Sequence, residues 1–233
     1  MRKMGSPRAY TIASLALLIS NSCFAQEQVK HIGVFVEPYY RAAANAAGTP
    51  QVAVARAFDA RLSLNEPTKI KEVEAEIRAN PDLITPMTLM VLSIRLYDMG
   101  FREDSVFWHY VAKDRMFTIN RVVSDGISGA MTATRDFAAT AGQAINGYAF
   151  CNPETQRSQR KRAFEWVRDN PYRAIFLPQL ASPFTDREAA LREAVSALEN
   201  NVRKEAEFLS DNANIERLKK VRLENGTHAK YCW

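Results

Sequence analysis

Helix start and stop signals recur along most of this chain, and they constrain its fold more than any other feature. Thr85-Pro86 has the form of a helix N-cap followed by proline at the first helical position, and Gly100 is suited to end that helix in a left-handed conformation. The stretches between such signals are rich in Ala, Glu, Arg and Leu, with apolar residues at three- and four-residue steps. Alternating strand patterns are nearly absent. The sequence therefore predicts an all-α fold built from antiparallel helical hairpins.

These signals also set the expected element boundaries. One short segment, residues 31–36 (HIGVFV), is expected to be extended rather than helical. A capping box at Thr185 and Glu188 opens the longest expected helix. The break at residues 124–129 (SDGISG) separates N-terminal hairpins from a C-terminal helical part, and we expect the two to pack as one domain. The N-terminal hairpins span residues 26–123, and the C-terminal helical part spans 130–233. The helices are expected at 50–63, 67–79, 86–99, 102–122, 132–150, 153–170, within 172–183, at 186–209 and around 215–224.

The first 25 residues have the form of a cleaved secretory signal peptide. Arg2, Lys3 and Arg8 give a basic start, residues 12–19 (IASLALLI) are apolar, and residues 23–25 (CFA) offer a cleavage point. The apolar run is too short to remain as a membrane span, which needs about 20 residues. A retained anchor and a lipoprotein signal are the alternatives, but the residues before the first cysteine do not fit a lipoprotein. We expect export to a bacterial periplasm or secretion.

Removal of this leader makes the chain nearly neutral. The whole sequence has 31 Lys and Arg against 26 Asp and Glu, and without the three leader cations the counts are 28 and 26, a net charge of +2. So small a charge gives no general attraction to nucleic acid. We expect the partner to be another protein, with no nucleic acid bound and no transmembrane anchor after cleavage.

Export also predicts how the cysteines pair. Cys23 leaves with the leader, so Cys151 and Cys232 remain as an even pair in an oxidising compartment. We expect them to form one disulfide, which fastens residues 231–233 to the body of the protein. Two separate buried thiols are the alternative. A redox role is disfavoured because no Cys-x-x-Cys pair is present.

Residues 86–116 resemble one tetratricopeptide-type helical hairpin. That family places large apolar residues at the fourth, seventh and eleventh positions, small residues at the eighth, twentieth and twenty-seventh, and glycine near the turn. The matching residues here are Leu89, Leu92 and Leu96, then Ser93, Ser105 and Ala112, with Gly100 at the turn. The resemblance implies close packing of an antiparallel helix pair and, through the family's usual role, peptide binding.

A dense aromatic run in the expected helix 102–122 provides the first candidate partner-binding residues. The four residues Phe107-Trp108-His109-Tyr110 point in four directions on a helix, so a core on one side cannot contain them all. One interpretation places Trp108 and His109 at the edge of a partner-binding groove, with Arg102 at the helix start nearby. The other interpretation packs all four against flanking helices.

A basic cluster provides the second set of candidates. Arg157, Arg160, Lys161 and Arg162 lie near an expected helix start, where positive charge is mildly unfavourable. This placement indicates contact with an acidic partner or an anionic lipid surface. A solvated helix face, partly neutralised by neighbouring glutamates, is the alternative.

The sequence contains no recognisable catalytic or cofactor-binding motif. The serine-nucleophile elbow, the phosphate loop and the dinucleotide fingerprint are all missing. Glu103 and Asp104 are adjacent, so on a helix their carboxylates do not face each other. Three scattered histidines do not predict a metal site. We expect no cofactor and no enzymatic activity, and Glu37 and His31 are the residues to test if hydrolysis were found.

These features together predict a small exported helical protein, closed by one disulfide, that binds another protein. We expect a scaffold or adaptor of envelope machinery. The alternative is an immunity protein that neutralises a toxin targeted to the periplasm. A periplasmic hydrolase is the third hypothesis.

Overall fold

The structure is a computed structural model that describes residues 28–32, 58, 60–123, 128–178 and 180–233, with the backbone alone for 128–133. Within these ranges every regular element is a helix, and no strand occurs. The all-α fold class is therefore confirmed. The elements are α3 (Pro67–Ala79), α4 (Pro86–Asp98), α5 (Arg102–Val122), α6 (Ser128–Ala149), α7 (Pro153–Asp169), the 3-10 helix η2 (Arg173–Phe176), α8 (Arg187–Phe208), α9 (Asn212–Glu224) and α10 (Thr227–Tyr231).

Prolines and capping side chains begin the helices where the sequence predicts. The Thr85 hydroxyl accepts a hydrogen bond from the Thr88 backbone N–H at 3.1 Å and caps α4. The Asn152 amide oxygen accepts from the backbone N–H groups of Glu154 and Thr155 at 3.0 and 3.2 Å and caps α7. Gly100 lies in the turn that follows α4 and has a φ of 87°, a conformation that favours glycine. These boundaries are local in origin, since each depends on residues adjacent in sequence.

Three boundaries differ from the predictions. Asp186, and not Thr185, caps α8 by accepting from the Ala189 N–H at 2.9 Å, because a carboxylate at this position reaches the first turn. Helix α6 begins at Ser128, so the end of the predicted linker 124–129 is helical. A short helix, α10, follows Gly226 and was not predicted. Of the expected helix 50–63, the structure describes Phe58 and residues 60–63, and the helix ends at Leu62. The rest of it, and the extended segment beyond Ile32, lie outside the described residues.

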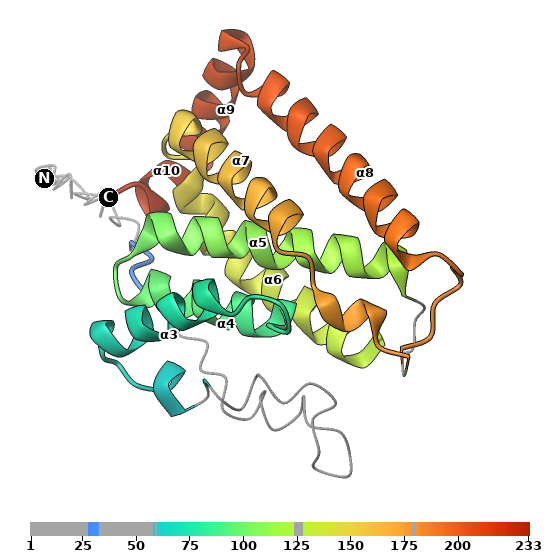
Figure 1. The fold of residues 1–233 in the computed structure, drawn as a ribbon. Coiled ribbons are helices and arrows are strands. Elements are labelled where there is room, and N and C mark those ends of the chain that lie inside the picture. Colours follow the sequence, from blue (N-terminus) through green and yellow to red (C-terminus); the bar gives the residue numbers. More distant parts are fainter. Residues whose placement is uncertain (1–27, 33–57, 59, 124–127, 179) are drawn as a thin grey trace, which may run out of the picture.

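Helix α5 lies at the centre of the fold, and other helices cover it on all sides (Figure 1). Eight consecutive residues, 105–112, are buried. Because eight residues make more than two turns, every face of this stretch is covered. Helices α4, α6, α7 and α8 all pack against α5. A helix enclosed in this way cannot present its middle to a partner.

The α4–α5 hairpin packs through the small residues that the sequence singles out. The Ser93 hydroxyl donates to the Ser105 backbone carbonyl at 2.8 Å, and both side chains are fully buried. Such small side chains let two helix backbones approach closely. The hairpin is therefore antiparallel and tightly packed, as expected. Its resemblance to a tetratricopeptide unit stays a prediction.

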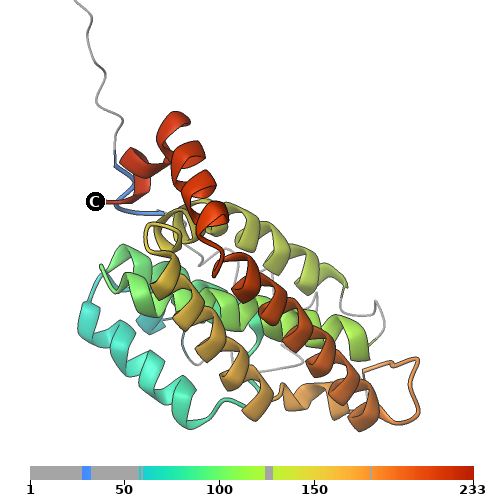
Figure 2. The ribbon, with the colours of Figure 1, turned by 90° about the horizontal axis from the view of Figure 1, so that it is seen from above.

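One hydrophobic core contains residues from both sides of the predicted linker. Ile94 and Trp108 come from the N-terminal part, and Ile145 and Phe164 from the C-terminal part. Figure 2 shows α6, α7 and α8 arranged around α5 from above. Helix α8 buries one face at three- and four-residue steps, whereas α9 buries Arg222 alone and extends away from the body.

A buried arginine holds two loops of the fold together. Arg115, on α5, donates hydrogen bonds to the carbonyl oxygens of Pro81 at 2.9 Å, Ile84 at 2.7 Å and Asn170 at 2.6 Å. Its guanidinium carbon also lies 4.9 Å from the centre of the Trp166 ring. Burial lowers the pKa of Arg115 to about 10, which leaves it charged at neutral pH. The α3–α4 connection and the end of α7 are thus fixed to the same side chain.

Candidate functional site

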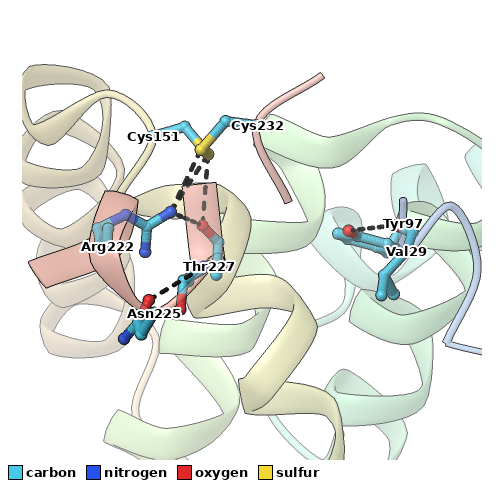
Figure 3. The surroundings of a disulfide bond; sticks show 8 residues. Val29, Tyr97, Cys151, Arg222, Asn225, Thr227 and Cys232 are labelled. Carbon is cyan, nitrogen blue, oxygen red and sulfur yellow. Dashed lines mark hydrogen bonds between the residues drawn. A yellow bond between two sulfur atoms is a disulfide. The ribbon is translucent and has the colours of Figure 1, made fainter. Parts of the chain in front are cut away.

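Both ends of the described chain meet at one edge of the molecule, in a region that we call the terminal clasp (residues 28–32 and 227–233). The Val29 backbone N–H donates to the Lys230 carbonyl at 2.9 Å. The Val29 carbonyl accepts from the Tyr97 hydroxyl at 3.0 Å (Figure 3), and the Ile32 N–H donates to the Asp98 carboxylate at 2.6 Å. The N-terminal segment is therefore held by the C-terminal tail on one side and by α4 on the other.

A disulfide between Cys151 and Cys232 fastens this clasp to the body, which confirms the predicted pairing (Figure 3). The Arg222 guanidinium donates to the Gly147 carbonyl at 2.6 Å and lies 3.2 Å from the Cys232 sulfur. A Cβ atom at Gly147 would stand 2.6 Å from the Tyr231 ring, so only glycine lets the tail approach α6 this closely. The tail is thus held by covalent, polar and packing contacts together.

We expect the mature chain, without its leader, to contain no free thiol. The bridge uses Cys151 and Cys232, and the third cysteine, Cys23, lies in the leader that we expect to be removed. The test is a thiol titration of protein unfolded in denaturant without a reductant. A titration after reduction, which must find two thiols, is the control. Two reactive thiols before reduction would contradict the bridge.

Beside the disulfide lies a cluster of cations and aromatic rings that we call the terminal patch (Lys30, Arg102 and Trp233, with Tyr97 and Tyr148 beneath). The Arg102 guanidinium carbon lies 3.9 Å from the centre of the Trp233 ring, and the Lys30 ammonium lies 5.3 Å from it. Trp233 is 40% exposed and Lys30 is exposed, so the patch reaches the surface. Of the predicted binding residues, Arg102 belongs to it.

The terminal patch is tied to the clasp through Tyr97. Burial raises the pKa of the Tyr97 hydroxyl, and a hydrogen bond from Arg102 opposes that rise. The same hydroxyl donates to the Val29 carbonyl. Arg102, Tyr97 and the N-terminal segment therefore form one connected set of contacts.

The prediction that Trp108 and His109 border a partner-binding groove is wrong, because both side chains are fully buried. Trp108 donates from its indole nitrogen to the Glu74 carboxylate at 2.9 Å and packs edge-on against Trp166. His109 makes no hydrogen bond to the described residues through either ring nitrogen. Burial, with smaller contributions from Lys113 and a nearby arginine, lowers the pKa of His109 to about 3. The alternative interpretation, core packing, holds for this aromatic run.

The predicted basic cluster does not form one surface patch. Arg160 is buried and pairs with Asp114, and its Nε lies 3.1 Å from the Glu205 carboxylate. Lys161 is exposed and pairs with a neighbouring glutamate at 2.7 Å, and Arg157 lies partly buried on the same helix. Periodicity explains the difference between Arg160 and Lys161, since adjacent residues on α7 point about 100° apart around the helix axis.

A cavity of about 130 Å³ adjoins the disulfide between the starts of α5 and α7 and the end of α6. Gln156 in its lining is fully buried, and its amide oxygen accepts no hydrogen bond from the described residues. The volume is well below the roughly 300 Å³ of a pocket for a drug-sized ligand. The cavity suits a group the size of one side chain. Its lining is Glu103, Val106, Tyr148, Ala149, Cys151, Asn152, Thr155 and Gln156.

The residues considered for catalysis do not come together. Asp104 pairs with Lys71 at 2.9 Å, while Glu103 borders the cavity. His31 is exposed at the clasp, and Glu37 lies outside the described residues. Within the described part of the chain, no three His, Cys, Asp or Glu side chains stand together as a metal site, and no helix has the length and apolarity to cross a bilayer.

Sequence reasoning did not find Lys30, Tyr97, Tyr148 or Trp233 as site residues. They lie in four separate segments, and no local pattern links them. The cysteine pairing is the one signal that could place Trp233, because it fastens the tail to the body. The site therefore depends on a long-range covalent contact.

The comparisons with known proteins identify one extensive relative. The chain is 33% identical over 212 residues to an uncharacterized protein of Haemophilus influenzae, and the alignment covers 91% of this chain and 83% of that protein. No protein-family model and no solved structure matches the sequence. Identity across nearly the whole of both proteins indicates a common fold and descent. The chain therefore belongs to the same family as this Haemophilus influenzae protein.

Proposed function

We propose that this chain is exported and binds another protein of the bacterial envelope, as a scaffold or adaptor. The observation that carries the proposal is the Cys151–Cys232 bridge, which fixes the tail so that Trp233 remains 40% exposed against Arg102. Tryptophan and arginine are the residue types most enriched where binding energy concentrates. A rigid support lowers the entropy lost when such side chains are ordered by a partner.

Export is supported by the same bridge and by the sequence of the leader. Disulfides persist in oxidising compartments such as the periplasm and are rare in the cytosol. The relative is a bacterial protein, which agrees with a bacterial source for this chain.

We expect the protein recovered from cells to begin after Ala25 and to crosslink to a small set of envelope proteins. The experiment adds a membrane-permeant crosslinker to intact cells and isolates the protein with an antibody, since a tag at either end would disturb the clasp. Mass spectrometry then identifies the partners, and N-terminal sequencing checks the cleavage. Cells that lack the gene are the control.

Three outcomes would contradict the proposal. Recovery of uncleaved protein from the cytosol would remove export. Recovery of a secreted toxin as the partner, with toxin sensitivity in cells that lack the gene, would replace the scaffold with an immunity protein. Hydrolysis by the purified chain would replace both with an enzyme.

A further inference from the structure

The charge of Arg102 is the starting point for an inference about what the partner presents. Arg102 makes no ion pair with any described carboxylate, and its Nε is buried without a hydrogen-bond partner. By contrast, Arg160 and Lys161 are neutralised by carboxylates from within the fold. Arg102 therefore carries a positive charge at the edge of the molecule that the described chain does not offset by an ion pair.

The geometry of Arg102 leaves it able to bind a further group. Its planar guanidinium lies over the Trp233 ring at 3.9 Å, and further rings, Tyr97 and Tyr148, lie 5.2 and 6.0 Å away. Stacking uses the flat face of a guanidinium, whereas hydrogen bonding uses its edge. A stacked arginine can thus donate two parallel hydrogen bonds to one carboxylate.

Neighbouring charges favour an acidic group at this place. Lys30 lies over the same Trp233 ring, and Lys230 lies over the Tyr231 ring at 5.3 Å. Two carboxylates lie near the tyrosines of the patch. Burial and then Glu103 raise the pKa of the Tyr148 hydroxyl, and burial raises the pKa of the Tyr97 hydroxyl, with Asp98 adding to that rise. Lys30 and Arg102 lie over the same ring, and neither forms an ion pair with a described carboxylate, so this face of the patch favours an anionic group.

We propose that the terminal patch binds a carboxylate-rich segment of a partner protein, with Arg102 as the central contact and the disulfide as the support of Trp233. This inference rests on the proposed function and names the chemistry of the partner. An anionic lipid surface is the less favoured source of negative charge. Lipid-binding segments generally gather four to eight cations, and the terminal patch with Lys230 has three.

The disulfide enters because it determines where Trp233 lies. Trp233 directly follows Cys232, and Lys30 directly follows Val29, whose backbone bonds to Lys230. Without the bridge, residues 227–233 would depend on noncovalent contacts alone. The stacked arrangement of Arg102 and Trp233 would then be less populated, and binding would weaken.

The test measures binding of a hexaglutamate peptide to the mature chain by titration calorimetry in low salt, with hexaglutamine as the uncharged control. We expect hexaglutamate to bind, and Arg102→Gln or Trp233→Ala to weaken it at least tenfold. Arg102→Lys keeps the charge without the fork and is expected to lose several-fold. Lys161→Ala, the matched control, removes one exposed positive charge from α7 and should change binding less than twofold. Replacing both cysteines by alanine should weaken binding as Trp233→Ala does.

Three results would overturn the inference. These are hexaglutamate binding no better than hexaglutamine, equal losses for Arg102→Gln and Lys161→Ala, and binding to phosphatidylglycerol vesicles with none to the peptide. The outcome is separable from the proposed function. An envelope partner whose crosslinking is unaffected by Arg102→Gln would leave the proposed function standing and remove this site. Binding of the peptide in the calorimeter, with no partner found in cells, would leave this site standing and remove the proposed function.

Discussion

Replacing Arg115 by methionine is expected to lower the free energy of unfolding by roughly 3 to 5 kcal/mol. The change removes hydrogen bonds to the carbonyl oxygens of Pro81, Ile84 and Asn170, and it leaves these acceptors without their charged donor. Part of this loss is offset, because the variant no longer pays the desolvation cost of burying a charged guanidinium. The measurement is the urea midpoint at pH 7, together with its slope.

A matched variant on the same helix separates this effect from loss of charge. Arg121 is exposed and lies over the Phe117 ring at 4.5 Å, so Arg121→Met should change the free energy of unfolding by less than about 1 kcal/mol. Arg115→Lys, which offers a smaller and less directional donor, should fall between the two. An equal, small effect for both arginines would show that Arg115 does not hold the loops.

Acidification is expected to destabilise the protein strongly through His109. Burial holds the pKa of His109 near 3 in the folded state, against 6.5 for an exposed histidine. Between these values the unfolded chain binds more protons than the folded one. The contribution to stability is therefore fully present above pH 6.5 and is lost as the pH falls toward 3. A gap of this size corresponds to about 5 kcal/mol, with a slope of up to about 1.4 kcal/mol per pH unit.

The comparison with His109→Met isolates this group from others that titrate in acid. Glu74 also loses stabilising contacts at low pH. Burial alone would raise the pKa of its carboxyl group, but hydrogen bonds from Lys71 and Trp108 outweigh burial and lower it. The difference between wild type and His109→Met in urea unfolding from pH 7 to 4 removes that shared part. We expect the variant to be at least as stable at pH 7, because neither ring nitrogen has a partner within the described structure. Parallel pH profiles for the two proteins would contradict a neutral, buried His109.

The helix boundaries could be predicted because they depend on neighbouring residues. Pro67, Pro86 and Pro153 begin helices, and the sequence bounds of α5 agree with the structure. The predicted start of α8 is one residue early, because the spacing of Thr185 and Glu188 favours a capping box whereas Asp186 is the better N-cap residue and forms the cap. The cysteine pairing could be predicted because only two cysteines lie beyond the expected leader.

The candidate site was mostly beyond the reach of sequence reasoning. Tryptophan is common in binding contacts, so the residue type alone favoured a surface role for Trp108. Its burial results from the four helices that pack around α5, and the sequence of α5 does not show how many helices will cover it. Arg160 has the sequence context of a surface cation, but Asp114 on α5 and Glu205 on α8 neutralise it from across the fold. Lys30 and Trp233 become neighbours only when the two ends of the chain meet.

The bridge between Cys151 and Cys232 has a consequence for a chain that is cut. It closes a ring with a sequence separation of 81 residues, and this ring contains α7, α8 and α9. Leu177 and Phe184, in the connection between α7 and α8, are exposed to proteases. A single cleavage there would yield two fragments that stay joined through sulfur, so nicked molecules would migrate as one species until a reductant separates them.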